Sequence, residues 1–157
     1  MDFLPMDTLE RNRPLSASEM LLARWMLEHG EPKTREFLEQ LAAAEVTPSR
    51  CPCGCGSINF QIKGREPAPP GAHILGNFIS GPDTAPAGIF IFESGGLLSG
   101  IEVYGLAGDA PAQLPREETL RHFSTGGGVI EGPGSHVELA VSGRSRVSTR
   151  HLRAVSL

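Results

Sequence analysis

The sequence is poor in the residues on which several large classes of protein depend. Its 157 residues include three cysteines, one tryptophan, one tyrosine and two lysines. Three cysteines cannot build the disulfide framework of a small secreted domain. The longest apolar run, residues 20–27, contains Arg24 and is too short to cross a membrane. The N-terminus has acidic residues where a secretory signal has basic ones. We therefore expect a cytoplasmic protein with no membrane segment.

Acidic residues are missing from the C-terminal end. All 18 lie at or before Glu138, whereas residues 143–157 contain four arginines and no acid. Residues 1–142, with ten basic and 18 acidic residues, therefore carry a net charge of −8. Such a body repels the phosphates of nucleic acid, and it suits a basic protein partner because complementary fields speed association. The alternative is that the charge only keeps the protein soluble.

Residues 1–45 predict an extended arm followed by a helical hairpin. Residues 1–14 are polar and contain two prolines. Ser16 and Glu19 have the spacing of a capping box, Gly30 is a helix stop, and Pro32 suits the first turn of a second helix. Residues at helical spacing give each helix of the hairpin one buried face: Leu22, Trp25, Met26 and His29 in the first helix, and Phe37, Leu38, Leu41 and Ala42 in the second.

A period of two then replaces the helical period. It predicts strands over residues 57–63, 72–80, 88–93 and 97–106, with a short helix over 115–122. The fold class is α+β, in which the hairpin packs on an antiparallel meander of at least four strands whose other face is wet. Residues 15–123 form this single domain. Residues 124–157 are a Gly-rich linker and a basic tail, which adds an edge strand or stays separate.

The most concentrated chemistry lies in Cys51, Cys53 and Cys55, within Cys-Pro-Cys-Gly-Cys-Gly. Thiolates suit zinc, although the usual zinc knuckle has two residues between its cysteines. Three interpretations stay open: buried thiols lining a turn, a metal site, and a reactive or disulfide-forming pair. A metal site needs a fourth ligand, for which His73 is the first candidate, followed by His29 or another chain.

No catalytic motif is present in the sequence. Ser99 is one place too late for a nucleophile elbow, residues 126–128 lack the setting of a dinucleotide fingerprint, and no Walker lysine occurs. We therefore expect no enzymatic activity, and no cofactor unless the cysteines bind zinc.

A partner-binding surface is predicted on the outward face of the last strand and beyond it. Tyrosine is enriched in binding hot spots, and carboxylates around it steer a basic partner. The alternative is an ordinary solvated face. The candidate residues are Glu102, Tyr104, Asp109, Glu117 and Glu118.

Two stretches resemble a group of small bacterial proteins. One is Cys-x-Cys-Gly-Cys-x-Ser-Ile, here residues 51–58, and the other is Gly-x-Leu-Ser-Gly-Leu-Glu-Val-Tyr, here within residues 95–104 with isoleucine at position 101. The resemblance covers residues 15–123 and implies no activity. In size, charge and architecture the chain is also similar to immunity proteins that neutralise basic toxins. The leading hypothesis is thus a cytoplasmic protein-binding module, with an immunity or antitoxin role; the alternative is a small zinc- or thiol-dependent protein centred on the three cysteines.

Overall fold

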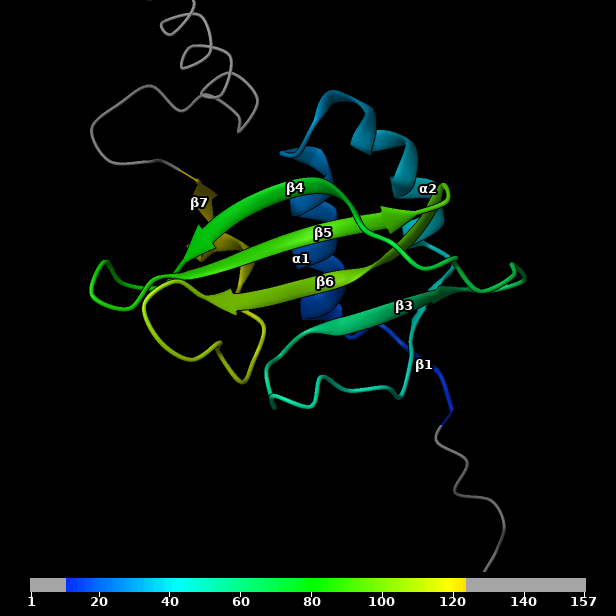
Figure 1. The fold of residues 1–157 in the computed structure, drawn as a ribbon. Coiled ribbons are helices and arrows are strands. Elements are labelled where there is room, and N and C mark those ends of the chain that lie inside the picture. The colour runs from blue at the N-terminus through cyan, green and yellow to red at the C-terminus, as the bar shows by residue number, and fades with distance from the viewer. Residues whose placement is uncertain (1–10, 124–157) are drawn as a thin grey trace, which may run out of the picture. The chain divides into compact units, whose positions relative to one another are not determined.

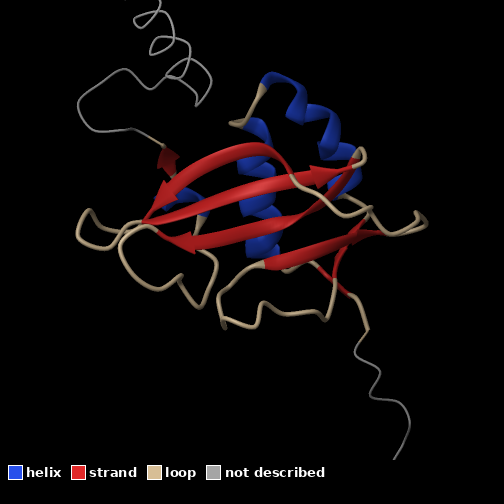
Figure 2. Cartoon of the chain, viewed as in Figure 1, coloured by secondary structure: helices blue, strands red, loops and turns tan. Residues whose placement is uncertain are grey.

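Helices cover one face of a seven-stranded antiparallel sheet, which makes the fold α+β (Figures 1 and 2). The computed structural model describes residues 11–123, and these belong, except for Phe123, to one compact unit, Met1–His122. Most of the predicted arm, and all of the predicted linker, tail and edge strand, lie outside the described residues. Within residues 11–123 no helix has the length and apolar character needed to cross a membrane.

The strands follow the order β1-β2-β3-β6-β5-β4-β7 across the sheet. Their bounds are β1 Arg13–Pro14, β2 Ala44–Val46, β3 Ile58–Ile62, β4 His73–Ser80, β5 Ala87–Ser94, β6 Leu97–Gly105 and β7 Arg121–His122. The helices are α1 Ala17–Glu28 and the single-turn α2 Leu38–Leu41, with 3-10 helices η1 Pro32–Phe37 and η2 Glu117–Thr119.

The meander is shorter than expected. β4, β5 and β6 pair in succession, but β3 pairs with β6 and not with its neighbour in sequence, β4. The connection between β3 and β4 contains three prolines, Pro67, Pro69 and Pro70. Because proline has no amide hydrogen, these residues cannot donate the hydrogen bonds that pair the two strands of a tight hairpin. The chain instead crosses the sheet, and the outer edge of β4 is occupied by β7.

The first helix begins as predicted, whereas the second helix of the expected hairpin is shorter and less regular than predicted. Ser16 and Glu19 form a complete capping box at α1. The following segment is a 3-10 helix and one α-helical turn, and residues 44–46 form β2 where a helix was expected. The backbone groups at the end of this segment bond to β3 and its flanks, through Lys63 N to Ala43 O at 2.8 Å and Thr47 N to Asn59 O at 2.9 Å. These backbone groups bond to the neighbouring strand, so they cannot form the hydrogen bonds that would extend the helix.

The core lies between α1 and the sheet, and the buried stripe of α1 is rotated from the predicted one. Leu22, Ala23, Met26 and Leu27 are at most 1% exposed. Trp25 is half-buried; its ring stacks on His29 at 4.1 Å between centroids and meets Phe78 edge-on at 5.1 Å. Trp25 thus closes the side of the core and does not occupy its centre.

The opposite face of the sheet carries aromatic rings and is less polar than the sequence suggested. Phe90, Phe92 and Tyr104 are half-buried there, with ring centroids of Phe90 5.8 Å from Phe92 and 6.0 Å from Tyr104. No helix of the described region lies over this face in Figures 1 and 2. We refer to it as the outer face.

Candidate metal centre

The three cysteines lie in the loop that joins β2 to β3. A turn brings the first two together, because Gly54 N donates to Cys51 O at 3.0 Å and Gly54 has a φ of 81°. That φ favours glycine. Further along, Gly56 N donates to Pro111 O at 2.9 Å. The loop is therefore folded by its own turn and held against the segment that follows β6.

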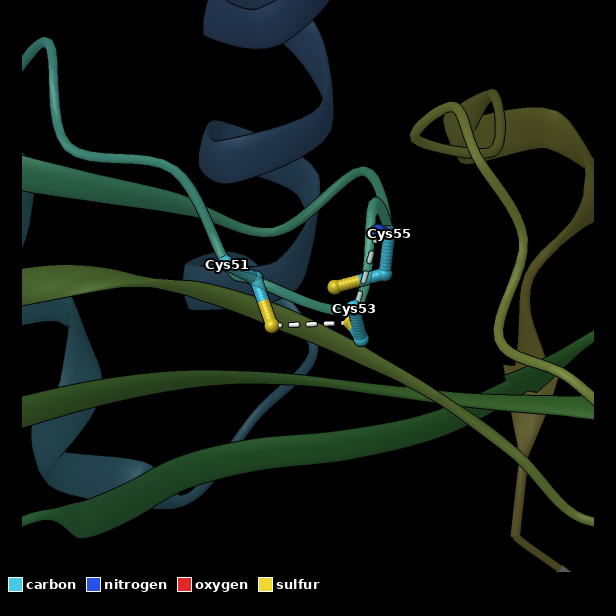
Figure 3. Close-up of side chains that lie close together, drawn as sticks. All are labelled: Cys51, Cys53 and Cys55. Carbon is cyan, nitrogen blue, oxygen red and sulfur yellow. Dashed lines mark hydrogen bonds between the residues drawn. The ribbon is translucent and has the colours of Figure 1, made fainter.

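The sulfur atoms face a common space (Figure 3). Cys51 Sγ lies 2.8 Å from Cys53 Sγ, and all three sulfurs lie within 4.8 Å of one another. The amide of Cys55 also donates to Cys53 Sγ at 3.4 Å. Tetrahedral zinc with bonds of about 2.3 Å to sulfur holds its thiolates about 3.8 Å apart. The sulfur–sulfur distances in the cluster start at 2.8 Å and reach no more than 4.8 Å, a range that includes this value. Small side-chain rotations are therefore enough to place three thiolates around one ion.

The environment makes the thiols unequal. The hydrogen bond with the Cys51 thiol raises the pKa of exposed Cys53 to about 11. The hydroxyl of Ser57 lowers the pKa of Cys55 to about 7. Ser57 Oγ accepts from Val103 N at 3.0 Å and from the thiol of Cys55 at 3.1 Å. Once Cys55 is a thiolate, the Ser57 hydroxyl can donate to the sulfur. A hydrogen bond to a thiolate favours the charged form.

The structure does not bring His73 into the sulfur cluster. His73 is the first residue of β4, and its Nδ1 lies 3.1 Å from Glu93 Oε1. The other candidate, His29, stacks on Trp25 and places its Nδ1 2.8 Å from Trp25 O. Among residues 11–123, the group of donor atoms close enough to share an ion consists of the three cysteines.

The residues predicted to bind a partner do not share one surface. Glu102 is exposed and Tyr104 half-buried on the outer face, where both were expected. Asp109 is exposed in the loop after β6. Glu117 and Glu118 begin η2, which contacts α1 on the other side of the sheet. Glu118 also pairs with Arg116 at 3.2 Å.

Sequence reasoning did not assign a role to Ser57. The alternation placed it at the start of a strand, and the structure shows it bonded to both the Cys55 thiol and the β6 backbone. A hydroxyl two residues after the last cysteine is the local signal. Its second partner, Val103, is 46 residues away in the sequence, so the local pattern could not predict this hydrogen bond.

Comparison with known proteins adds no functional assignment. The chain matches no protein-family model, no curated protein and no solved structure. The resemblance that rests on residues 51–58 and 95–104 stays a prediction.

Proposed function

We propose that the protein binds a soft divalent cation, zinc by preference, through Cys51, Cys53 and Cys55. The observation that carries this proposal is the approach of three thiol sulfurs to within 4.8 Å on one loop. Thiolates are the ligands that soft metals prefer, and three of them are a common protein share of a zinc site.

Two features favour a metal over thiols that merely line a turn. Cys53 is exposed, whereas a cysteine with a packing role is among the most buried residue types. The loop is also held by hydrogen bonds at Gly54 and Gly56, on either side of the last cysteine. A loop that is already folded loses less conformational freedom when it binds an ion.

The fourth position on the ion belongs to water or to a residue that the cluster does not contain. A zinc site with three protein ligands and one exchangeable position is open, in the sense that a ligand or a second protein can reach the ion. The exposed side of the cluster at Cys53 is where that access lies.

The test is metal analysis of protein purified without chelator, under reducing conditions. We expect close to one zinc per chain, and we expect Co²⁺ to give an intense thiolate charge-transfer band. Cys53→Ser should weaken binding strongly, whereas Ser49→Ala, in the same loop, should not. Absence of zinc and of the Co²⁺ band, together with three freely reacting thiols, would remove the proposal.

A basic protein partner, and with it an immunity or antitoxin role, stays a prediction from the charge of the chain. The described region carries ten basic and 13 acidic residues, a net charge of −3. Its outer face places Glu102 beside Phe90 and Tyr104. Reversing Glu102 to lysine should slow association with such a partner and leave stability nearly unchanged.

A further inference from the structure

A pocket of about 610 Å³ opens beside the sulfur cluster. Its walls come from Arg11 and Arg13, the start of α1, residues 46–50, residues 55–58 and residues 112–114. Cys55 is part of the wall, so the pocket and the cluster share a residue. A volume of this size is that of a small-molecule site and exceeds what a simple inorganic ion fills.

The charge of the pocket is opposite to that of its surroundings. Arg50 and the ion pair of Arg13 with Glu19 lie in the lining, and these three residues together carry a net charge of +1. The described region as a whole has a net charge of −3. A cavity with a local excess of guanidinium groups attracts an anion and raises its local concentration.

The one acid is already committed to groups of the protein. Glu19 accepts from Arg13 Nη1 at 2.9 Å and Nη2 at 2.8 Å, and from Ser16 N at 2.8 Å. This fixes Arg13 at the wall. The charge of Glu19 is thus balanced by Arg13, and Arg50 keeps its positive charge for the pocket.

Hydroxyl groups complete a wall suited to oxyanions. Ser16 and Ser18 place their Oγ atoms 3.2 Å apart at the start of α1, and Thr47 and Ser49 place theirs 2.9 Å apart on the loop after β2. Guanidinium and hydroxyl groups are the side chains that bind carboxylate and phosphate oxygens. The positive end of the α1 dipole acts in the same direction.

We propose that this pocket binds a small organic molecule through a phosphate or carboxylate group, with Arg50 as an anchoring residue. The proposal goes beyond zinc binding, because none of the groups that attract the anion needs a metal. Because Cys55 also lines the pocket, a molecule held there lies beside the sulfur cluster.

The test uses reduced, zinc-free, full-length protein at low ionic strength and three probes with the same ring: phenyl phosphate, benzoate and the neutral benzyl alcohol. Binding is measured by calorimetry and by amide shifts. We expect at least one anion to bind, and benzyl alcohol not to bind. The two anionic probes show whether phosphate or carboxylate is preferred.

Two arginine variants decide whether the pocket is responsible. Arg50→Gln should weaken binding about tenfold or more, because a charge-assisted hydrogen bond is lost. Arg65→Gln makes the same change of charge at an exposed residue outside the pocket and should bind as the native protein does.

Equal loss in both variants, or no anion binding up to about 10 mM, overturns the proposal. Since no metal is present in this experiment, either result leaves the zinc proposal untouched. Conversely, a protein that binds no zinc can still show the anion site.

Discussion

The ring of Tyr104 lies directly over Gly88, its cross-strand partner between β5 and β6. A Cβ at position 88 would occupy the space of the ring itself. The tyrosine hydroxyl meanwhile donates to Asn77 Oδ1 on β4 at 3.2 Å. One side chain thus spans three strands of the outer face, and glycine is what allows it to lie flat.

This contact predicts that the effects of substitutions at Gly88 and Tyr104 on stability depend on each other. Gly88→Ala should destabilise the protein by about 1–3 kcal/mol, because the ring must move to admit the methyl group. In a Tyr104→Ala background the same substitution should have little effect. Urea unfolding of the four proteins of this double-mutant cycle measures the coupling. Additive effects would show that the ring does not constrain position 88.

Thr34 provides the second prediction. It is 1% exposed, and its hydroxyl bonds to Leu27 O and Glu31 O, which ties the end of α1 to η1. Thr34→Val keeps the shape and leaves buried carbonyl groups without this partner, so we expect a loss of about 1–3 kcal/mol. Thr34→Ser, which keeps the hydroxyl, should lose less. Equal losses in urea unfolding would assign the effect to packing.

Trp25 should contribute less than a fully buried tryptophan. Because its ring stacks on His29 and makes a T-shaped contact with Phe78 but is only half-buried, we expect Trp25→Ala to destabilise by about 2 kcal/mol, below the 3–5 typical of a buried site. Leu21→Ala, at a residue 54% exposed on the same helix, should lose under about 1 kcal/mol. A loss at Trp25 no larger than at Leu21 would contradict the packing described.

The pKa of Cys55 predicts how its reactivity depends on pH. The thiolate is the nucleophile, so alkylation of Cys55 in metal-free protein should rise with pH through about 7. Ser57→Ala removes the hydroxyl that favours the thiolate and should move the rise to higher pH. Site-resolved mass spectrometry after short iodoacetamide pulses measures both curves, with Ser49→Ala as the control. An unchanged midpoint in Ser57→Ala would show that another group lowers this pKa.

The distance between Cys51 Sγ and Cys53 Sγ, 2.8 Å, predicts which disulfide accumulates when mild oxidation reaches equilibrium. With oxidised glutathione, these two thiols should form a disulfide and pass two hydrogens to it, giving two molecules of reduced glutathione and a mass about 2 Da lower, even where the Cys55 thiolate reacts first. The product should bind zinc poorly. Peptide mapping after equilibration should find Cys55 free; a bond that includes Cys55 at equilibrium would contradict this pairing.

The sequence was informative where neighbours along the chain are also neighbours in space. The alternation of Ile58, Phe60 and Ile62 marked β3, and three cysteines within five residues marked the sulfur cluster. β1 and β2 were missed because strands of two and three residues contain too few positions to show a period.

The pocket was missed for a different reason. Arg13 and Arg50 are far apart in sequence, and they line one pocket because β1 pairs with β2, with Arg13 opposite Val46. Neither residue belongs to a local motif. The order β3-β6, which depends on a pairing of Ile58 with Ile101, could not be read from a local pattern either.

The hydrogen bonds of Ser57 link the sulfur cluster to the backbone amide of Val103 in β6. The Ser57 oxygen accepts both the amide hydrogen of Val103 in β6 and the thiol hydrogen of Cys55, so a single hydroxyl connects the cysteine loop with a core strand. Whatever changes the charge on that sulfur, whether a proton, an ion or an oxidant, also changes how strongly the oxygen holds the amide. The Val103 resonance therefore gives the state of the cluster from within β6, without a label on any cysteine.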